Sequence, residues 1–270
     1  MSELMKKMRR KLARLTVFRF MADSRFNGEL LRLFARRVGE ARVADFLANE
    51  EHRFLGRILL DGNRSKSQIF QDLWVLHETN ELRGGFFVEF GATDGVSLSN
   101  TCLLEQEYGW SGILAEPNPV WHAKLRENRK AAISDACVAA RDGETVTFLA
   151  TDQPELGTMV AFAPEDSHSD ARRAAKRINV TTLSLTSLLN THNAPKRIDF
   201  MSIDTEGSEY DILSAFDFSA YDVRLFAIEH NGTEAEGKLD ALMAKHGYER
   251  RFRALSWFDG WYAKRDELGQ

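Results

Sequence analysis

The chain has 270 residues, of which 43% are hydrophobic and 28% charged, so it can bury a full core as a soluble globular protein. Its net charge of −4 gives no overall attraction to nucleic acid, and no apolar run approaches the roughly 20 residues that span a bilayer. The two cysteines, Cys102 and Cys137, lack the spacing of a zinc site and are too few for a disulfide framework, which favours reduced thiols in a cytoplasm.

The first 60 residues predict helices with a basic surface. Apolar residues recur at helical spacing from Leu4 to Leu15, and basic residues outnumber acidic ones by roughly two to one in this segment. The stretch "DGNRSKS", residues 61–67, predicts a turn. We therefore expect a basic helical extension over residues 1–65 and a second domain over residues 66–270. Three roles stay open for the extension: contact with anionic lipid at the inner face of the membrane, homo-oligomerisation, or a helical cap on the second domain.

From about residue 68 onward, segments with helical and strand patterns alternate. Such alternation is typical of an α/β protein with a mostly parallel sheet covered on both faces. Ligands of such sheets bind beyond the carboxyl ends of the strands, where the strand order reverses. A polar, irregular stretch is expected between Ala150 and Val180, and the chain is expected to end in a closing hairpin. We expect strands within residues 85–92, 111–118, 131–139, 144–150, 197–207 and 223–232, and helices within 68–82, 99–108, 119–129, 208–216 and 236–247.

The first expected strand leads into "FFVEFGATDGVSLSNT", which combines two glycines with two carboxylates. Gly91 and Gly95 have no side chains, so a ligand can approach the backbone there. Glu89 and Asp94 are acceptors that suit an ammonium group and hydroxyls and would repel a pyrophosphate. The chain contains no G-x-G-x-x-G pattern, so a nicotinamide or flavin dinucleotide is disfavoured.

The second expected strand ends in "ILAEPNP", which places Glu116 about 20 to 25 residues beyond the glycines. A carboxylate in this position can accept hydrogen bonds from both hydroxyls of a ribose, and Pro117 stiffens the turn that carries it. In the next loop, Asp135 could accept from the amino group of an adenine while Ala136 packs on the ring. A plain surface aspartate is the alternative for Asp135.

Acidic residues gather after the two strands that come later in the chain. Asp204 and Glu206 lie at the end of "DFMSIDTEGSEYDIL", and Glu209 begins the next helix, where it serves either as a cap or in function. Glu229 and His230 end the following strand. His230 is the first candidate for a general base, and Asp204 or Glu206 is the second. Alternatively, Asp204, Glu206 and Glu229 could hold a divalent cation such as magnesium, because carboxylate oxygens suit that ion.

These motifs resemble the FkbM-type family of S-adenosylmethionine-dependent methyltransferases. The resemblance covers about residues 66–262, and the D-x-E-G-x-E block is its most specific part. It implies a Rossmann-like class I methyltransferase sheet that is mostly parallel, with a reversed last strand. The matching stretches are "FFVEFGATDGVSLSNT", "GILAEPNP", "AAISDACV", "IDFMSIDTEGSEYDIL" and "FAIEHN".

The resemblance also implies which residues bind the cofactor. The methionine part would lie along the loop that carries Gly91 and Gly95, called the glycine loop below. The ribose would lie at Glu116 and the adenine beside Asp135 and Ala136. Asp204 would lie near the methionine amine or the transferred methyl group. The residues expected to contact S-adenosylmethionine are Lys66, Ser67, Gln68, Glu89, Gly91, Asp94, Gly95, Asn100, Glu116, Pro117, Asp135, Ala136 and Asp204.

Enzymes of the FkbM type usually O-methylate sugars or polyketide-derived hydroxyls. The resemblance therefore implies as acceptor a hydroxyl of a sugar in a polysaccharide, glycolipid or glycosylated metabolite. Phe162, Trp257 and Trp261 could stack on a sugar ring, or they could be ordinary loop and core residues. Two alternatives remain: a non-catalytic binding module with the same fold, and a methyltransferase for a non-sugar small molecule. Methylation of nucleic acid is disfavoured, because no "NPPY"-like or "DPPY"-like block is present.

Overall fold

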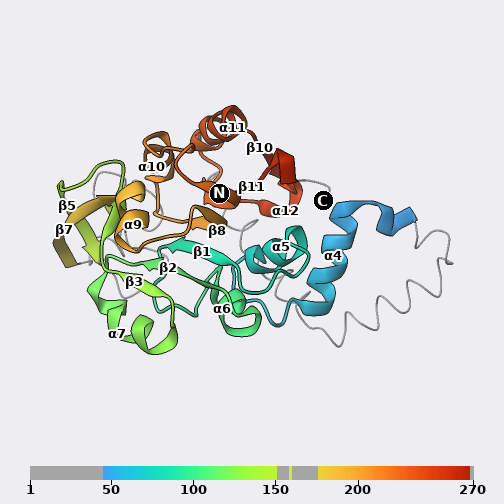
Figure 1. Ribbon diagram of the computed structural model, residues 1–270, viewed down its shortest axis with the longest axis horizontal. Helices are drawn as coiled ribbons and strands as arrows, with labels where there is room; N and C mark the ends of the chain where they lie inside the picture. The colour runs from blue at the N-terminus through green and yellow to red at the C-terminus, as the bar shows by residue number, and fades with distance from the viewer. Residues whose placement is uncertain (1–44, 151–157, 160–175, 268–270) are drawn as a thin grey trace, which may run out of the picture. The chain divides into compact units, whose positions relative to one another are not determined.

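The computed structural model describes residues 45–150, 158–159 and 176–267 (Figure 1). The chain divides into two compact units, residues 1–82 and 83–270, and each is treated by itself. The domain boundary expected between residues 65 and 66 stays a prediction. In the described ranges, no helix combines the length and the apolar character that crossing a bilayer requires.

The described part of the first unit contains helical residues 45–48 and then two further helices, which are joined by the expected turn. Helix α4 (Glu50–Asp61) is capped at its N-terminus by Asn49, whose side chain accepts a hydrogen bond from the backbone N–H of His52 in the first turn. Helix α5 (Gln71–Glu78) follows the turn. The buried carboxylate of Asp72 accepts from the backbone N–H of Lys66 at 3.0 Å, which holds the turn against the start of α5.

The second unit contains a seven-stranded sheet in the order β10-β11-β9-β8-β1-β2-β3. Its neighbouring strands pair in parallel except on either side of β11, which runs antiparallel to both β9 and β10. This arrangement confirms the expected fold class, including the reversed last strand. The strands are β1 (Phe86–Phe90), β2 (Ser111–Ala115), β3 (Ala132–Ser134), β8 (Arg197–Ile203), β9 (Asp222–Glu229), β10 (Tyr248–Arg251) and β11 (Asp259–Lys264).

Helices cover both faces of this sheet. Three of them, α9 (Leu185–Thr191), α10 (Glu209–Ser214) and α11 (Ala235–Lys245), pack their apolar side chains against one face and form a single core with it. The opposite side carries α6 (Cys102–Tyr108) and α7 (Pro119–Asn128) (Figure 1). Both cysteines are free and buried, and burial raises the pKa of the Cys137 thiol to about 11, as expected for inert reduced thiols.

A second, four-stranded sheet includes residues 158–159 and 176–180 of the stretch that was expected to be irregular, and the rest of that stretch lies outside the described residues. Strands β4 (Cys137–Ala139), β5 (Thr145–Ala150), β6 (Thr158–Met159) and β7 (Lys176–Ser184) form it in the order β4-β7-β5-β6. The single strand expected over residues 131–139 is also divided, because β3 pairs with β2 whereas β4 pairs with β7. The alternation of Ile178 and Val180 with polar residues was the available signal for β7.

The expected closing hairpin is confirmed, with the short helix α12 (Arg253–Ser256) in its connection. Trp261 on β11 is fully buried, so it belongs to the core and offers no surface to a sugar ring. Trp257 is half-buried, and its role as a stacking surface stays a prediction. Phe162 lies outside the described residues.

Candidate cofactor and acceptor site

Four carboxylates lie at the carboxyl ends of neighbouring parallel strands. The chain order runs outward from β1 on both sides, to β2 and β3 in one direction and to β8 and β9 in the other. The strand order therefore reverses at β1, where α/β sheets bind their ligands. Glu89 lies on β1, Glu116 directly follows β2, Asp204 directly follows β8, and Glu229 ends β9.

Left-handed backbone conformations gather in the loops that follow these strand ends. Thr93 and Leu98 after β1 have φ of 45° and 61°, Glu206 after β8 has φ of 58°, and Asn231 after β9 has φ of 51°. Residues with a side chain rarely adopt this conformation, and such strain is most often found at binding and catalytic sites. These residues lie at the carboxyl ends of the strands, an edge of the sheet called the rim below, and their location supports a functional site there.

The structure gives a physical reason for the two glycines that differs from the expected one. Gly91 has φ of +71°, and a Cβ atom there would lie 2.4 Å from the backbone oxygen of Asp204. Gly95 has φ of +80°, and its Cβ would lie 2.6 Å from Cγ of Arg129 and 2.7 Å from Cδ1 of Leu125. Both positions need glycine because neighbouring protein atoms leave no room. Their expected contact with the cofactor stays a prediction.

Glu89 organises the loop that follows it. Its buried carboxylate accepts hydrogen bonds from the backbone N–H of Asn100 at 2.7 Å and from the hydroxyls of Ser99 and Thr101. The guanidinium of Arg129 lies 3.7 Å away. Because its oxygens already have these partners, Glu89 shapes the glycine loop, and its predicted contact with the methionine part is not tested.

Asn100 offers an open acceptor on the same rim. Its Nδ2 donates to the hydroxyl of Ser202 on β8 at 2.9 Å, which fixes the side chain between β1 and β8. Its Oδ1 is buried and has no hydrogen-bond partner among the described residues. Buried acceptors are normally satisfied, so this atom indicates a place for a donor such as an ammonium group. The sequence could not show the Ser202 contact.

Glu116 is held at the end of β2 by two backbone donors. Its oxygens accept from the N–H groups of Thr93 at 2.9 Å and Asn118 at 2.7 Å. Burial raises the pKa of Glu116 to about 7, against the smaller opposing effect of the two hydrogen bonds. Neither partner was predicted from the sequence. Pro117 lies between Glu116 and Asn118, and its cofactor contact stays a prediction.

Asp94 and Asp135 make contacts that account for their presence without a ligand. Asp94 accepts from two backbone N–H groups of its own turn, including that of Ser97 at 2.7 Å. Asp135 is exposed and accepts from Nη2 of Arg126 at 2.6 and 2.7 Å. The adenine contact of Asp135 and Ala136 is therefore still a prediction. Lys66, Ser67 and Gln68 belong to the first unit, so their expected cofactor contact is untested as well.

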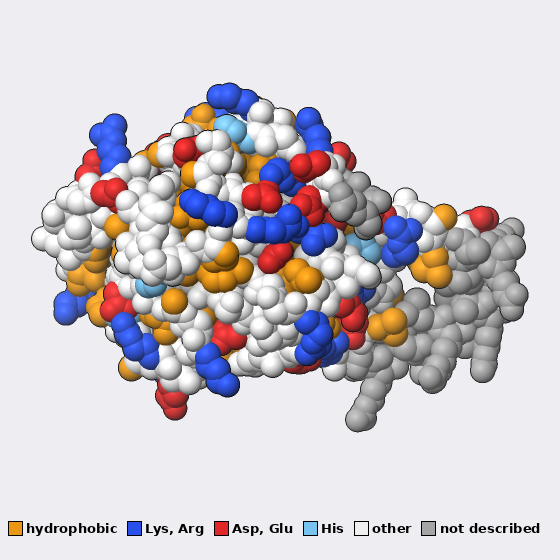
Figure 2. Space-filling model, in the orientation of Figure 1, with side chains coloured by type: hydrophobic (Ala, Val, Ile, Leu, Met, Phe, Trp, Pro, Cys, Tyr) orange, Lys and Arg blue, Asp and Glu red, His pale blue; other side chains and the backbone are white. Residues whose placement is uncertain are grey.

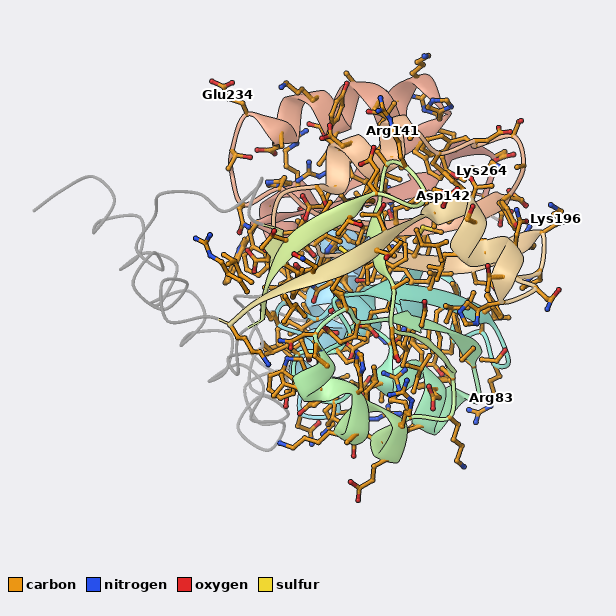
Figure 3. The ribbon with its side chains drawn as sticks, turned by 90° about the vertical axis from the view of Figure 1, so that its left-hand side faces the viewer. Arg83, Arg141, Asp142, Lys196, Glu234 and Lys264 are labelled. Carbon is orange, nitrogen blue, oxygen red and sulfur yellow. The ribbon has the colours of Figure 1, made fainter. Side chains whose placement is uncertain are left out.

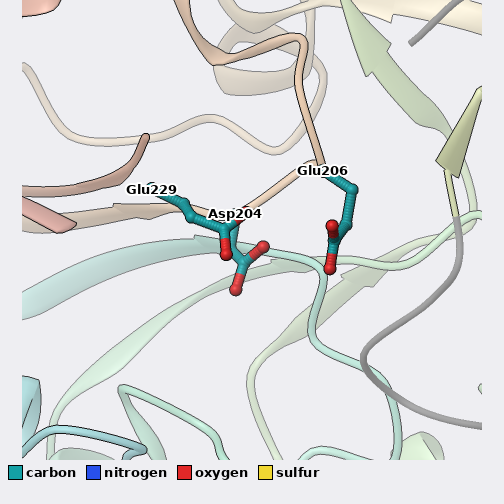
Figure 4. A group of neighbouring side chains, drawn as sticks. All are labelled: Asp204, Glu206 and Glu229. Carbon is teal, nitrogen blue, oxygen red and sulfur yellow. The ribbon is translucent and has the colours of Figure 1, made fainter. Parts of the chain in front are cut away.

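The acids of β8 and β9 converge as expected. One carboxylate oxygen from each of Asp204, Glu206 and Glu229 lies within 4.8 Å of the other two (Figure 4). Burial, and then the charges of the neighbouring acids, raise the pKa of both Asp204 and Glu229 well above the usual range. At an effective dielectric constant of about 20, each pair of like charges at such a distance repels by roughly 3 kcal/mol.

Asp259 is a fourth acid near this group, and no motif in the sequence pointed to it. It begins β11 and pairs in register with Glu229, and it is only 4% exposed. Its charge contributes to the raised pKa of Asp204 and Glu229. Glu209 accepts from the backbone N–H groups of Thr205 and Gly207 at the start of α10, and its charge also raises the pKa of Asp204 and Glu229. The choice between a capping and a functional role for Glu209 is not tested.

His230 is held inside the protein by contacts to both ring nitrogens. Nδ1 accepts from the backbone N–H of Gly232 at 3.0 Å, and Nε2 lies 3.1 Å from Nη2 of Arg250. The side chain is fully buried, and burial and the charge of Arg250 lower the pKa of the imidazole. These contacts favour a positioning role. The assignment of His230 as the general base, with Asp204 or Glu206 as the second candidate, stays a prediction.

We expect His230→Asn to lower the melting temperature and to leave the rate of methyl transfer within about threefold of the wild type. The asparagine Oδ1 can still accept from Gly232, whereas the contact to Arg250 is lost. The measurement is a single-turnover rate at a temperature well below both melting points. A general base contributes about 100-fold or more, so a loss of that size with an unchanged melting temperature would restore the original base assignment.

The strand order and the reversed β11 are those of the class I methyltransferase fold. The chain matches the family described as "Methyltransferase FkbM domain" over residues 89–250, and it belongs to that family. S-adenosylmethionine is the cofactor that this family implies, and the acceptors on the rim suit its ammonium group and ribose.

Two solved structures match this chain at low sequence identity. A precorrin-6y C5,15-methyltransferase from Geobacter metallireducens GS-15 is 13% identical with a TM-score of 0.36, over 71% of this chain and 84% of that one. A protein from Galdieria sulphuraria described as a candidate sarcosine dimethylglycine methyltransferase is 11% identical with a TM-score of 0.32, over 68% of this chain and 63% of that one. No curated protein matches the sequence.

Proposed function

We propose that this methyltransferase transfers the methyl group of S-adenosylmethionine to a hydroxyl of a sugar in a polysaccharide, glycolipid or glycosylated metabolite. The observation that carries the proposal is the row of buried and half-buried acceptors at the switch in strand order. Asn100, Glu116 and Asp204 lie there on three neighbouring strands or the loops that follow them. The choice of a sugar hydroxyl rests on the FkbM resemblance, because no residue contact identifies the acceptor.

The residues of the rim would divide the work between binding and proton transfer. Glu116 would accept from the ribose hydroxyls, while Asn100 Oδ1 and Asp204 would face the methionine ammonium group. Methyl transfer is an in-line displacement, so the main task of the protein is to align the acceptor oxygen with the methyl group. Asp204 or Glu206 would take the proton from the acceptor hydroxyl. A divalent cation such as magnesium is proposed as a second cofactor.

The partners and the location of the enzyme are part of this proposal. A cytoplasmic enzyme that acts on a lipid-linked glycan would suit a basic N-terminal extension in contact with anionic lipid, with homo-oligomerisation as the alternative. Most of that extension, residues 1–44, lies outside the described residues. Basic and acidic side chains are mixed on the face shown in Figure 2, a distribution that does not favour a nucleic-acid partner on that face.

The affinity for S-adenosylhomocysteine is expected to rise about tenfold between pH 6 and pH 8. Only ionised Glu116 can accept from both ribose hydroxyls, and with a pKa of about 7 it is mostly protonated at pH 6 and mostly ionised at pH 8. The raised pKa also means that folding stability falls as pH rises from about 4.5 to 7, because the folded state holds this proton more tightly. Calorimetric titration at several pH values measures the affinity.

Glu116→Gln is the control for this titration. The variant keeps an acceptor oxygen and the shape of the side chain but removes the charge. Its affinity for S-adenosylhomocysteine should therefore be weaker and independent of pH in this range. An equal pH dependence in the variant would contradict the role of Glu116. If neither protein binds S-adenosylhomocysteine while both give native circular dichroism spectra, the chain is a non-catalytic module and the proposed function is wrong.

A further inference from the structure

A second buried acceptor without a partner lies within the group of acids. Glu229 Oε2 is buried and has no hydrogen-bond partner among the described residues, and Glu229 as a whole is only 8% exposed. The side chain lies against Asp204, and the oxygens of both lie within 4.8 Å of an oxygen of Glu206 (Figure 4). A buried carboxylate oxygen without a donor is unfavourable, so this atom points to an ion or a donor that occupies the space between the three side chains.

The spacing of the three carboxylates fits one small cation. Two oxygens on opposite sides of Mg²⁺ lie about 4.2 Å apart, and around Ca²⁺ they lie about 4.8 Å apart. The three oxygens of this group, all within 4.8 Å of one another, can therefore reach a common ion with small side-chain adjustments. Glu206 is in the loop after β8 and, like Asp204, is half-buried.

The chemistry of the group favours a hard divalent ion over other cations. All three side chains offer carboxylate oxygens, which suit magnesium, manganese and calcium, whereas zinc and copper prefer nitrogen and sulfur ligands. His230 is adjacent in sequence, but Gly232 and Arg250 occupy its ring nitrogens. Asp259 adds a further negative charge opposite Glu229.

We propose that Asp204, Glu206 and Glu229 bind one divalent cation of the magnesium, manganese or calcium class. Three protein oxygens fill half of an octahedral shell, which leaves positions for water or for hydroxyls of the acceptor. What the ion does rests on the proposed function: a divalent cation lowers the pKa of a hydroxyl that it binds, and so favours an oxygen acceptor. The site itself requires neither S-adenosylmethionine nor the acceptor.

Titration of the full chain with Mn²⁺, followed by electron paramagnetic resonance without cofactor or acceptor, tests the site. We expect one saturable site per chain, from which Mg²⁺ or Ca²⁺ displaces the Mn²⁺. Glu206→Gln should weaken Mn²⁺ binding at least about tenfold, because it removes one charged ligand. The matched control is Glu234→Gln, an exposed acid after β9 that points away from the protein (Figure 3), and it should bind as the wild type does.

Absence of a saturable site in the wild type, or equal affinity in Glu206→Gln and wild type, would overturn the inference. Displacement by Mg²⁺ is measured on the wild type, so the test does not depend on how a variant folds. Titration of the same samples with S-adenosylhomocysteine separates the two proposals. Binding of S-adenosylhomocysteine without Mn²⁺ overturns only the cation site, whereas Mn²⁺ binding without S-adenosylhomocysteine supports the cation site and contradicts the proposed function.

Discussion

Gly91→Ala is expected to destabilise the protein by roughly 2–5 kcal/mol and to abolish binding of S-adenosylhomocysteine. The left-handed conformation costs an alanine about 1–2 kcal/mol, and overpacking against fixed atoms adds roughly 1–3 kcal/mol. The new Cβ would lie 2.4 Å from the backbone oxygen of Asp204, so the ends of β1 and β8 must move apart. Chemical denaturation followed by circular dichroism measures the loss.

Gly109→Ala is the matched control for this prediction. Gly109 also has φ of +71°, at the end of α6, but a Cβ there meets nothing within 4 Å. The Gly109→Ala variant should therefore lose only about 1–2 kcal/mol of unfolding free energy, which is the cost of the left-handed conformation, and it should still bind S-adenosylhomocysteine. Equal losses in the two variants would show that the contact with Asp204 is not the cause, because both glycines share the same backbone conformation.

Arg129→Met is expected to lower the free energy of unfolding by about 3–5 kcal/mol, because it leaves buried carboxylates without their partner. The guanidinium is fully buried. It donates to Glu105 at 2.9 Å and to the backbone oxygen of Gly95 at 2.9 Å, and it also contacts Ser99, Thr101 and Glu89. Its loss should loosen the glycine loop and weaken S-adenosylhomocysteine binding. Thermal melting and calorimetric titration measure the two effects.

Arg126→Met, in the last turn of α7 just before Arg129, is the control for the charge itself. Arg126 pairs with Asp135, but both side chains are 49% exposed, so solvent screens their attraction. Breaking such a pair costs about 1 kcal/mol or less. Similar melting temperatures for the two variants would contradict the role of Arg129 as the buried support of the glycine loop.

Local patterns in the sequence were sufficient to predict the fold class and the rim of the site. Alternating strands and helices indicate a mostly parallel sheet, and the carboxyl ends of parallel strands meet at one edge. The positions of Glu116, Asp204 and Glu229 at that edge could therefore be read from the point at which each apolar run ends. The FkbM resemblance supplied the reversed last strand and the nature of the cofactor.

Only the tertiary structure decided which atoms these residues contact. Asp259 reaches the acids because β11 pairs with β9, and the partners of Asn100 and Arg129 come from distant segments that packing brings together. The second sheet depends on the pairing of β5 with β7 across a long connection, and the burial of His230 depends on Arg250 from β10. Local periodicity carries no information about such pairings, because register and burial are set by contacts between residues far apart in the chain.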